Sequence, residues 1–424
     1  MPNDSAKEDS APSTCSEHVS TPRSVLIPDV IHHLSSFVAT QDLRELRLVS
    51  KSWNYAVTPV LKARTKTILK LDGNMADIKE QLEFSPINLY LLVEHPNQPF
   101  TLDPATFPSI RNLKSIYFSY IADRHGYLGV QEVCRKIVLA SSGSLQELKF
   151  EWDNESDVPS FESAVFPKLR NLGTDYFSDD DDAIVIKNLG HAITQSFPNL
   201  EHLAIGAENL HAIWELGLLP KFPRSLSSIT LDGPSNLFGL ECLFELPGRL
   251  KRLIFDEVHL EEIGTEMVEL PTMFYKLLKK HSQTLEELCM DIYWELSPSE
   301  DTDGLDWKFP MFSAMKTFKL CSSNFFRNIE FENSLGYFGE IDYETCFPVL
   351  ETLHVSTEQH DVAEVACFFP SGDIVVDWVK DVDIKIYTES DFDFEQASVY
   401  TRLFKIFPNA RDSVVKQLRK LLLE

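Results

Sequence analysis

One spacing of apolar residues recurs along most of the chain beyond residue 100. An apolar residue is followed by two variable positions, a second apolar residue, one variable position and a third apolar residue. Because side chains alternate along a strand, each such triplet predicts a short strand whose apolar residues face a core and whose intervening residues face the other way. The clear copies are Leu113-Ile116-Phe118, Leu145-Leu148-Phe150, Leu200-Leu203-Ile205, Leu226-Ile229-Leu231, Leu250-Leu253-Phe255, Leu285-Leu288-Met290, Met315-Phe318-Leu320 and Leu350-Leu353-Val355, with weaker ones at Leu169-Leu172 and Val379-Val382-Ile384.

Phe-Pro pairs and helical segments alternate with these triplets. Proline ends a preceding helix and pushes the residue before it into extended geometry. Residues 133–140, 183–195 and 273–280 have apolar residues at helical spacing, and the triplets begin 24 to 35 residues apart. This period is typical of a leucine-rich solenoid, so we predict an α/β fold in which residues 106–390 form an irregular, horseshoe-shaped array of leucine-rich repeats. The Phe-Pro pairs are Phe107-Pro108, Phe166-Pro167, Phe197-Pro198, Phe222-Pro223, Phe309-Pro310 and Phe347-Pro348.

Residues 25–68 have a different pattern, which predicts three short helices. Pro28 suits the first turn of one helix, because its missing N–H is not needed there. Thr40 and Ser50 are expected to cap the other two helices, and Pro59 is expected to interrupt or end the last one. The apolar residues outnumber those that so small a core needs, which indicates a binding face.

A motif runs through this first module. Ile27-Pro28-Asp29-Val30-Ile31 is followed by Leu34 and Phe37, and then by Asp42 to Trp53, which ends in LRLVSKSW. The stretch resembles the F-box, although Ile27 stands where that family usually has Leu. The resemblance implies that the module docks on a Skp-family adaptor, and through it on a cullin–RING ubiquitin ligase. The residues that match the apolar positions of the motif, and are implied to bind the adaptor, are Pro28, Val30, Ile31, Leu34, Leu43, Leu46, Val49 and Trp53.

The module and the repeats together resemble the leucine-rich class of F-box proteins over most of the chain. In that class the repeats hold the substrate. The resemblance therefore implies the substrate-recognition subunit of a Skp–cullin–F-box ubiquitin ligase, acting on a protein that the sequence does not identify. Two alternatives stay open: a protein-interaction scaffold that uses the adaptor contact without ubiquitylation, and a first module that is only a helical cap on the next domain.

The remaining segments are expected to flank these two parts. Residues 1–24 are rich in Ser, Thr, Pro and acidic residues and predict a disordered tail. Residues 69–105 are interpreted as a linker and the N-terminal cap of the solenoid. Residues 391–424 carry an apolar stripe at helical spacing and predict a helical C-terminal cap, which a solenoid needs to cover its last repeat.

Charge and cysteine content narrow the class of partner. Lys and Arg total 39 against 65 for Asp and Glu, which gives a net charge of −26. Such a chain repels nucleic acid and anionic lipid, so neither is an expected partner. No apolar run long enough to cross a membrane is present. The sequence has 7 cysteines, which are scattered and odd in number. This pattern favours a reducing compartment, so we expect a cytoplasmic or nuclear protein.

Catalytic motifs are missing from the sequence. It has no glycine-rich phosphate loop, no G-x-S-x-G elbow and no HExxH, so we expect neither an enzyme nor a bound cofactor or metal. His32-His33 is expected to face solvent. The run Asp179–Asp182 is interpreted as a solvated loop, with contact to a basic partner as the alternative. Lys251-Arg252 could form a local basic patch for a phosphate.

Acidic residues recur at the sixth position after the start of a triplet. Because equivalent strand positions lie side by side in a parallel sheet, they would form a column along one rim of the face opposite the core. We hypothesise that this column binds Lys or Arg of a partner. The alternative is local, because Asp at a strand end often caps the following turn. The acidic residues are Glu151, Asp175, Asp232, Asp256 and Asp291, while Ser119, Gly206, Cys321 and Ser356 occupy the same position elsewhere.

Overall fold

A computed structural model gives the structure of the chain, which divides into two compact units, Met1–Thr65 and Lys66–Glu424. The structure describes residues 28–70, 86–93, 110–120, 127–152, 161, 163–175, 183–235, 240–260, 270–294, 306–322, 328–357, 366–370, 374–386 and 401–410. The predicted tail 1–24, the Asp179–Asp182 run and most of the predicted cap 391–424 lie outside these residues. Within that cap, residues 401–406 are helical and are followed by the short helix η7 (Pro408–Ala410).

Unit 1 contains helices α1 (Pro28–Ser35), α2 (Thr40–Leu46) and α3 (Lys51–Arg64). Pro28 opens α1, as predicted. The predicted cap at Ser50 is confirmed, since its side chain accepts a hydrogen bond from the Trp53 backbone N–H at 3.2 Å. The predicted cap at Thr40 is wrong: Thr40 is the first helical residue, and the cap position belongs to Ala39, whose side chain offers no hydrogen bond.

The predicted break at Pro59 is also wrong, because α3 continues through it to Arg64. Proline inside a helix removes one hydrogen bond and crowds the carbonyl four residues earlier. Packing outweighs this cost, since Ala56 and Val57 before the proline and Leu61 after it are all buried in the core of unit 1. Tertiary contacts therefore set the length of α3, against the local preference of Pro59.

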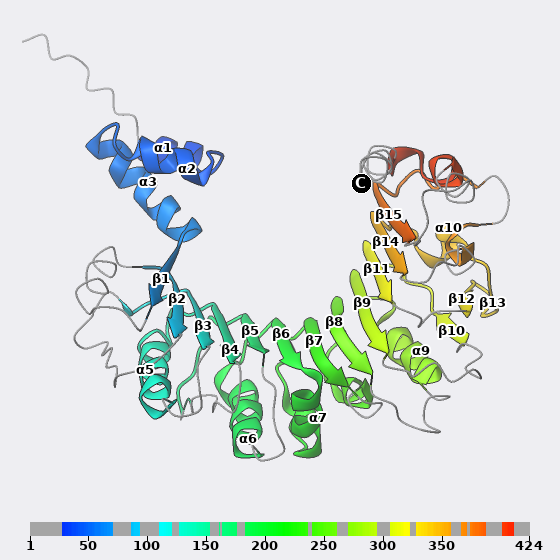
Figure 1. Ribbon diagram of the computed structural model, residues 1–424, viewed down its shortest axis with the longest axis horizontal. Helices are drawn as coiled ribbons and strands as arrows, with labels where there is room; N and C mark the ends of the chain where they lie inside the picture. Colours follow the sequence, from blue (N-terminus) through cyan, green and yellow to red (C-terminus); the bar gives the residue numbers. More distant parts are fainter. Residues whose placement is uncertain are drawn as a thin grey trace, which may run out of the picture. The chain divides into compact units, whose positions relative to one another are not determined.

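Unit 2 is a mixed α/β structure built on a 12-stranded sheet whose strand order follows the chain (Figure 1). Every neighbouring pair in this sheet is parallel. The strands are β1 (Lys66–Lys70), β2 (Asn88–Val93), β3 (Ser115–Tyr120), β4 (Glu147–Trp152), β5 (Asn171–Asp175), β6 (His202–Gly206), β7 (Ser228–Ser235), β8 (Arg252–Leu260), β9 (Glu287–Trp294), β11 (Thr317–Ser322), β14 (Thr352–Thr357) and β15 (Asp381–Ile386).

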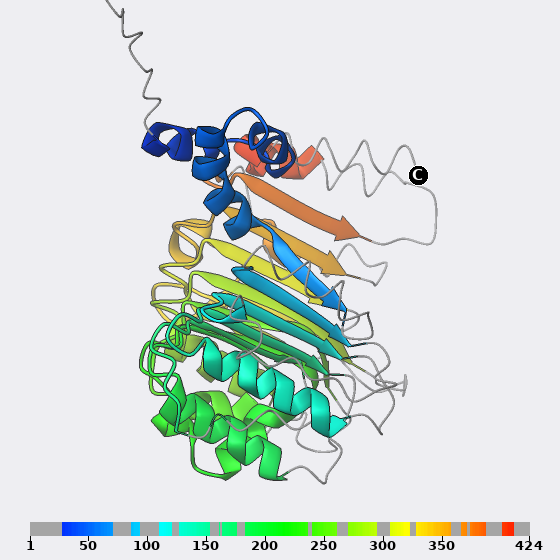
Figure 2. The ribbon, with the colours of Figure 1, turned by 90° about the vertical axis from the view of Figure 1, so that its left-hand side faces the viewer.

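Helices lie on the convex side of this curved sheet (Figures 1 and 2). The longer ones are α5 (Tyr127–Ala140), α6 (Ala183–His191), α7 (Ala207–Glu215) and α9 (Leu270–His281), and a π-helical turn, η2 (Ala192–Ser196), extends α6. The predicted helical segments 133–140, 183–195 and 273–280 fall within these helices. Shorter helices are η3 (Leu219–Lys221), η4 (Cys242–Glu245), α10 (Tyr343–Cys346) and η6 (Ala366–Phe368), and a second sheet comprises β10 (Asp306–Phe309), β12 (Asn328–Glu332) and β13 (Phe338–Gly339).

The apolar triplets form the core between the sheet and these helices. Each residue of the clear triplets is no more than 4% exposed. Phe166, Phe197 and Phe347 from the Phe-Pro pairs are fully buried beside them, whereas Phe107 lies outside the described residues. The predicted inward face of the strands is therefore confirmed.

Two strands of the sheet were not predicted. Residues 66–68, at the end of the predicted first module, belong to β1, and residues 88–93, inside the predicted linker, form β2. Leu69 of β1 and Leu89 and Leu91 of β2 lie in the core, so only β2 has two alternating buried residues. The triplet pattern missed them because Arg64 and Thr67 occupy the first two apolar positions of β1, and Pro86 occupies the first apolar position of β2.

Backbone hydrogen bonds fix the register between consecutive repeats. The residue before each strand uses one carbonyl to accept two N–H groups from the next repeat: Ser227 accepts from Lys251 and Arg252 at 2.7 and 3.1 Å, and Lys251 accepts from Glu286 and Glu287 at 2.7 and 3.0 Å. The same arrangement recurs from Lys114 to Asp381. Equivalent residues of neighbouring repeats are consequently aligned in rows across the sheet.

Candidate binding surfaces

The structure sorts the implied adaptor-binding residues into interior and surface positions. Ile31 and Leu43 are 0% exposed and form the centre of the core of unit 1. Leu46 and Trp53 are partly buried and pack against that core. These four side chains hold the three helices together, so they position a surface rather than provide it. The side chain of Pro28 lies outside the described residues.

The other three residues of that set are on the surface. Val30 and Leu34, one helical turn apart on α1, are 45% and 48% exposed, and Val49 is 64% exposed. Three more large apolar side chains in this part of the chain are exposed, although the F-box resemblance did not imply them as adaptor-binding residues: Phe37, Leu48 and Tyr55. Together with the first three they are called the apolar surface of unit 1, which comprises Val30, Leu34, Phe37, Leu48, Val49 and Tyr55.

The omitted residues come from two turns and from α3. Phe37 follows α1, and its ring meets the ring of His33 edge to face at a centroid distance of 5.3 Å. Leu48 lies in the turn before α3, and Tyr55 lies on α3. His32 and His33 are both exposed, as predicted. Leu48 lies inside LRLVSKSW, so the motif itself pointed to it. Only the packing of the helices shows that Leu48 is exposed while Leu46 and Trp53 of the same stretch are partly buried.

In unit 2 the residues between the buried ones line the concave face of the sheet. In β7, for example, Ile229 and Leu231 are buried in the core, whereas Thr230 and Asp232 are partly exposed on the opposite face. Because the strands are aligned, this alternation extends across the sheet as three rows. In β7 the three rows are represented by Ser228, Thr230 and Asp232.

The third row contains the acidic residues singled out in the sequence, which we call the carboxylate row. Glu151 is the register partner of Asp175, and Asp232 is the register partner of Asp256. Asp291 is aligned with Cys321 on the next strand. The structure therefore brings these positions together at the same ends of neighbouring strands. Asp256 is exposed, Glu151, Asp232 and Asp291 are partly exposed, and the side chain of Asp175 lies outside the described residues.

A register shift between β8 and β9 separates Asp256 from Asp291 in the alignment. Their charges nevertheless act on the same thiol. The pKa of Cys289 is raised to about 12. Burial is the largest cause, the neighbouring Cys321 is the next, and Asp291 and Asp256 also raise this pKa. Asp291 follows Cys289 by two residues on β9, and Asp256 lies on the neighbouring strand β8, whereas Cys289 itself is aligned with Ile254 and Lys319 in the middle row of the concave face.

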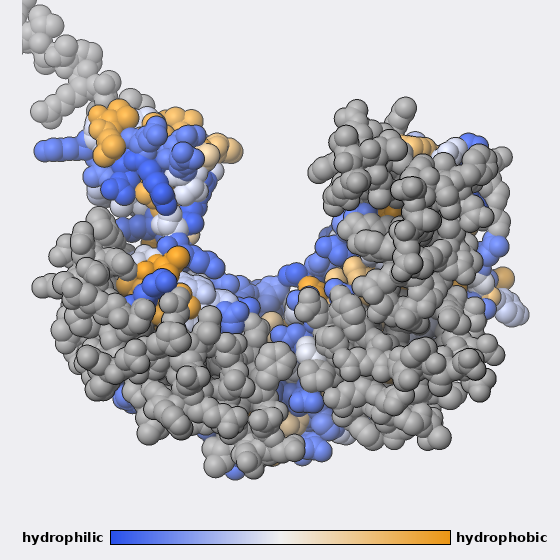
Figure 3. Space-filling view, viewed as in Figure 1, coloured by the Kyte–Doolittle hydropathy of each residue, from blue (hydrophilic) through white to orange (hydrophobic). Residues whose placement is uncertain are grey.

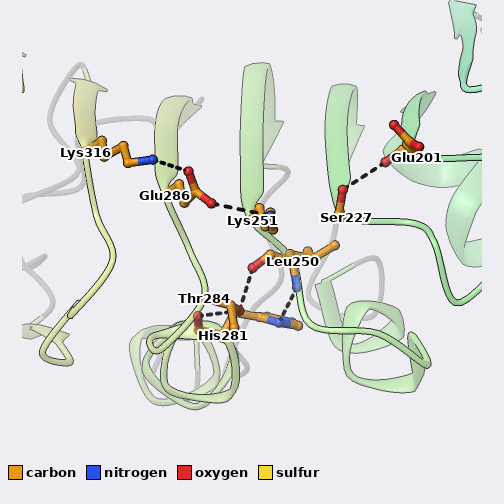
Figure 4. Close-up of polar contacts among 8 residues, drawn as sticks. All are labelled: Glu201, Ser227, Leu250, Lys251, His281, Thr284, Glu286 and Lys316. Carbon is orange, nitrogen blue, oxygen red and sulfur yellow. Dashed lines mark hydrogen bonds and ion pairs between the residues drawn. The ribbon is translucent and has the colours of Figure 1, made fainter.

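Charges at the opposite ends of the strands alternate in sign. Lys251 and Lys316 lie 3.6 and 2.6 Å from the two carboxylate oxygens of Glu286 (Figure 4). The hydrogen bond from Lys316 holds the pKa of Glu286 below its usual value. Arg170 pairs with Glu201, and Lys380 pairs with Glu351 at 3.1 Å. We call this set the rim ladder: Arg170, Glu201, Lys251, Glu286, Lys316, Glu351 and Lys380.

The rim ladder changes the interpretation of Lys251-Arg252. Lys251 is paired with Glu286, and the Arg252 guanidinium donates to Glu287 at 2.7 Å. Both cations thus have a carboxylate partner on the neighbouring strand. This pairing disfavours Lys251-Arg252 as a basic patch for a phosphate, since Arg252 is the register partner of Glu287 and Lys251 lies beside Glu286.

An aromatic group lies on the concave face near its β1 end. Tyr90 and Tyr117 are register partners whose rings stack at a centroid distance of 4.5 Å. Ile68, aligned with Tyr90, is 55% exposed. The ammonium groups of Lys66 and Lys149 lie 5.7 and 5.4 Å from the Tyr117 ring. Sequence reasoning missed this aromatic platform (Ile68, Tyr90 and Tyr117) because it depends on β1 and β2.

The buried titratable groups described below in unit 2 have a structural role. The Nδ1 atom of His281 accepts a hydrogen bond from the Leu250 backbone N–H at 3.0 Å (Figure 4), and burial lowers the pKa of this imidazole to about 4. Burial also raises the pKa of Cys346 to about 11, so this thiol stays protonated near neutral pH. Among the described residues, His, Cys, Asp and Glu form no group of three or more that could hold a metal ion.

No helix in the described part of the chain is long and apolar enough to cross a membrane. Neither a search of protein-family models nor a search of curated proteins found a match to this sequence. The resemblance of residues 27–53 to the F-box therefore stays a prediction that rests on the motif itself.

Proposed function

We propose that this chain is the substrate-recognition subunit of a Skp–cullin–F-box ubiquitin ligase. In this proposal unit 1 is an F-box that binds a Skp-family adaptor, and unit 2 is a solenoid of leucine-rich repeats that holds a protein substrate. The chain performs no bond chemistry itself. It raises the ubiquitylation rate by holding the substrate near a ubiquitin-loaded enzyme, which replaces a bimolecular encounter with a local one.

The apolar surface of unit 1 is the observation that carries the proposal. Among the described residues of this unit, five apolar residues are buried in the core, while six large ones remain exposed. Exposed apolar side chains gain free energy when a partner covers them, at roughly 25 cal/mol for each Å² removed from water. Their positions in the F-box-like stretch favour an adaptor protein as that partner.

The repetition in unit 2 supports the second half of the proposal. The strands follow chain order, their apolar residues form one continuous core, and their helices lie on one side. Leucine-rich solenoids have this organisation, and their opposite face is an extended surface suited to another protein. Here that face has polar rows and an aromatic platform, which is the usual mixture in protein interfaces.

Co-purification with a Skp-family adaptor tests the proposal. We compare the native chain with a variant carrying Leu34→Asp and Phe37→Asp, two exposed residues of unit 1. Burying those charges in an apolar contact should weaken adaptor binding at least about a hundredfold, while circular dichroism shows that the helices persist. The matched control is Leu335→Asp, the same change at a residue of unit 2 that is 78% exposed.

Each outcome is informative. Binding by the native chain and the control, but not by the variant, supports the proposal. A native chain that does not bind the adaptor overturns it, and so does equal binding by all three proteins. Ubiquitin transfer to a bound substrate in the reconstituted assembly then separates a ligase subunit from a scaffold that only shares the adaptor contact.

A further inference from the structure

The concave face of unit 2 differs in charge between its two edges. At the rim ladder, acidic and basic residues alternate, and each has a residue of opposite charge within ion-pair distance. At the carboxylate row, the positions from β4 to β9 are Glu151, Asp175, Gly206, Asp232, Asp256 and Asp291, with no Lys or Arg among them. From β4 to β9 the sheet thus has one edge of mixed charge and one edge of a single sign, while Lys70 of β1 and Lys385 of β15 occupy the equivalent positions at the two ends of the row.

The core does not account for the acidic residues of this row. Glu151 is aligned with Asp175 and Asp232 with Asp256 on adjacent parallel strands, so acidic residues recur at one position of the sheet. The side chains of Glu151, Asp232, Asp256 and Asp291 are exposed or partly exposed, so packing in the core does not require them to be acidic. A partner that brings cations to this row would place opposite charges against it, which is the condition for charge complementarity at an interface.

The aromatic platform adjoins the β4 end of this row. The Tyr117 hydroxyl donates a hydrogen bond to the Glu151 carboxylate, so the two features are joined by a direct contact. Figure 3 shows hydrophobic residues grouped near the β1–β2 end of a mostly hydrophilic inner face. Stacked tyrosines beside an exposed isoleucine form the kind of surface on which a large apolar side chain packs.

We infer that the concave face of unit 2 binds an extended basic segment of a partner protein, whose Lys or Arg side chains meet the carboxylate row and whose apolar end packs on the aromatic platform. This inference rests on the proposed function and names the chemistry of its substrate. Six adjacent strands are about 24 Å wide, at about 4.8 Å per strand spacing, so roughly seven extended residues cover the row.

The test uses two fluorescent peptides of eight residues and the full-length protein. One peptide alternates arginine and serine and begins with leucine, and the other has glutamate in place of arginine. Fluorescence anisotropy measures their affinity at low and physiological salt. We expect the arginine peptide to bind, with an affinity that falls as salt rises, and the glutamate peptide not to bind.

Two charge-matched variants locate the contact. Asp232→Asn with Asp256→Asn removes two charges from the carboxylate row, and Glu286→Gln with Glu351→Gln removes two from the rim ladder. The first should weaken arginine-peptide binding about tenfold and the second less than about twofold. A third variant, Asp256→Lys, changes one exposed residue and should weaken binding further than Asp256→Asn alone, which guards against a folding defect in the double variant.

Equal losses in the two double variants would overturn the inference, because they would show attraction by net charge alone. Failure of the native chain to bind the arginine peptide would also overturn it. Adaptor co-purification is measured on the same proteins. Loss of peptide binding with adaptor binding intact sinks only this inference, whereas loss of adaptor binding with peptide binding intact sinks only the proposed function.

Discussion

The two units use apolar residues in opposite ways. Among the described residues, unit 1 buries five and exposes six large ones, whereas unit 2 exposes eight large ones but buries a far larger set in one continuous core that runs from Leu69 to Phe407. A short three-helix unit has too little interior to enclose more, while a repeating sheet gains interior with every strand. Relative to the size of the core, exposed apolar residues are therefore more frequent in the described part of unit 1, where removal of one buried side chain affects a larger share of the packing.

The largest expected effect is in the core of unit 2. Phe255 is fully buried and packs on Phe274 at a centroid distance of 5.4 Å. Phe255→Ala should lower the free energy of unfolding of unit 2 by about 3–5 kcal/mol, measured by urea denaturation. The control, Ile68→Ala, changes an exposed residue of the same unit and should cost less than about 1 kcal/mol. Similar costs at both positions would contradict the assigned core.

Unit 1 should respond nearly as strongly to a smaller change. Leu43 is fully buried, and Leu43→Ala should cost about 2–5 kcal/mol, enough to unfold much of a unit whose described residues include five in the core. Leu48→Ala, on a side chain that is 84% exposed, should stay within about 0.5 kcal/mol. Hydrogen exchange of the α3 amides measures both variants. Protection lost equally in the two would refute the division into interior and surface.

Mild acid should destabilise unit 2. The pKa of His281 is lowered from 6.5 to about 4 in the folded chain, so its contribution to stability is full above 6.5 and is lost as pH falls from 6.5 towards 4. The loss should be on the order of 3 kcal/mol. His281→Gln keeps an acceptor for the Leu250 N–H and should flatten the dependence of the melting temperature on pH in this range. An unchanged slope would show that other groups cause it.

Removing the helix cap of unit 1 should have a smaller effect. Ser50→Ala deletes the acceptor for the Trp53 N–H and should cost about 1 kcal/mol, visible as a lower melting temperature of the helices. Ser50→Asp retains an acceptor at this position and should restore most of the loss. A destabilised aspartate variant would indicate that the serine acts through packing.

The rim ladder should have the smallest effect on stability. Glu286→Gln removes a carboxylate that pairs with Lys316 at 2.6 Å, yet both side chains are substantially exposed. Solvent screening limits the expected cost to less than about 1 kcal/mol, and added salt should reduce it further. Because its folded-state pKa is lowered, the contribution of Glu286 should disappear as pH falls through that pKa. A larger cost that is insensitive to salt would contradict this account.

Periodic patterns made much of the large sheet predictable. A triplet such as Leu226-Ile229-Leu231 specifies its own inward face, and repetition then aligns Asp232 with Asp256 without further information. Patterns fail where packing outweighs local preference, as at Pro59, or where one position departs from the pattern, as at Pro86. They also cannot separate Ile31 from Val30, which are adjacent in the motif, because burial depends on where α3 lies against α1.

The shared carbonyls between repeats have a mechanical consequence. From β3 onward, each strand of the sheet is joined to the strand before it by a short, repeated set of backbone hydrogen bonds, as at Ser227 and Lys251. A pull along the array is therefore carried from junction to junction in series, so small rotations at every junction add up to a large change in curvature. Unit 2 should behave as a spring, which can widen or narrow around a bound protein while the core of each repeat keeps its packing.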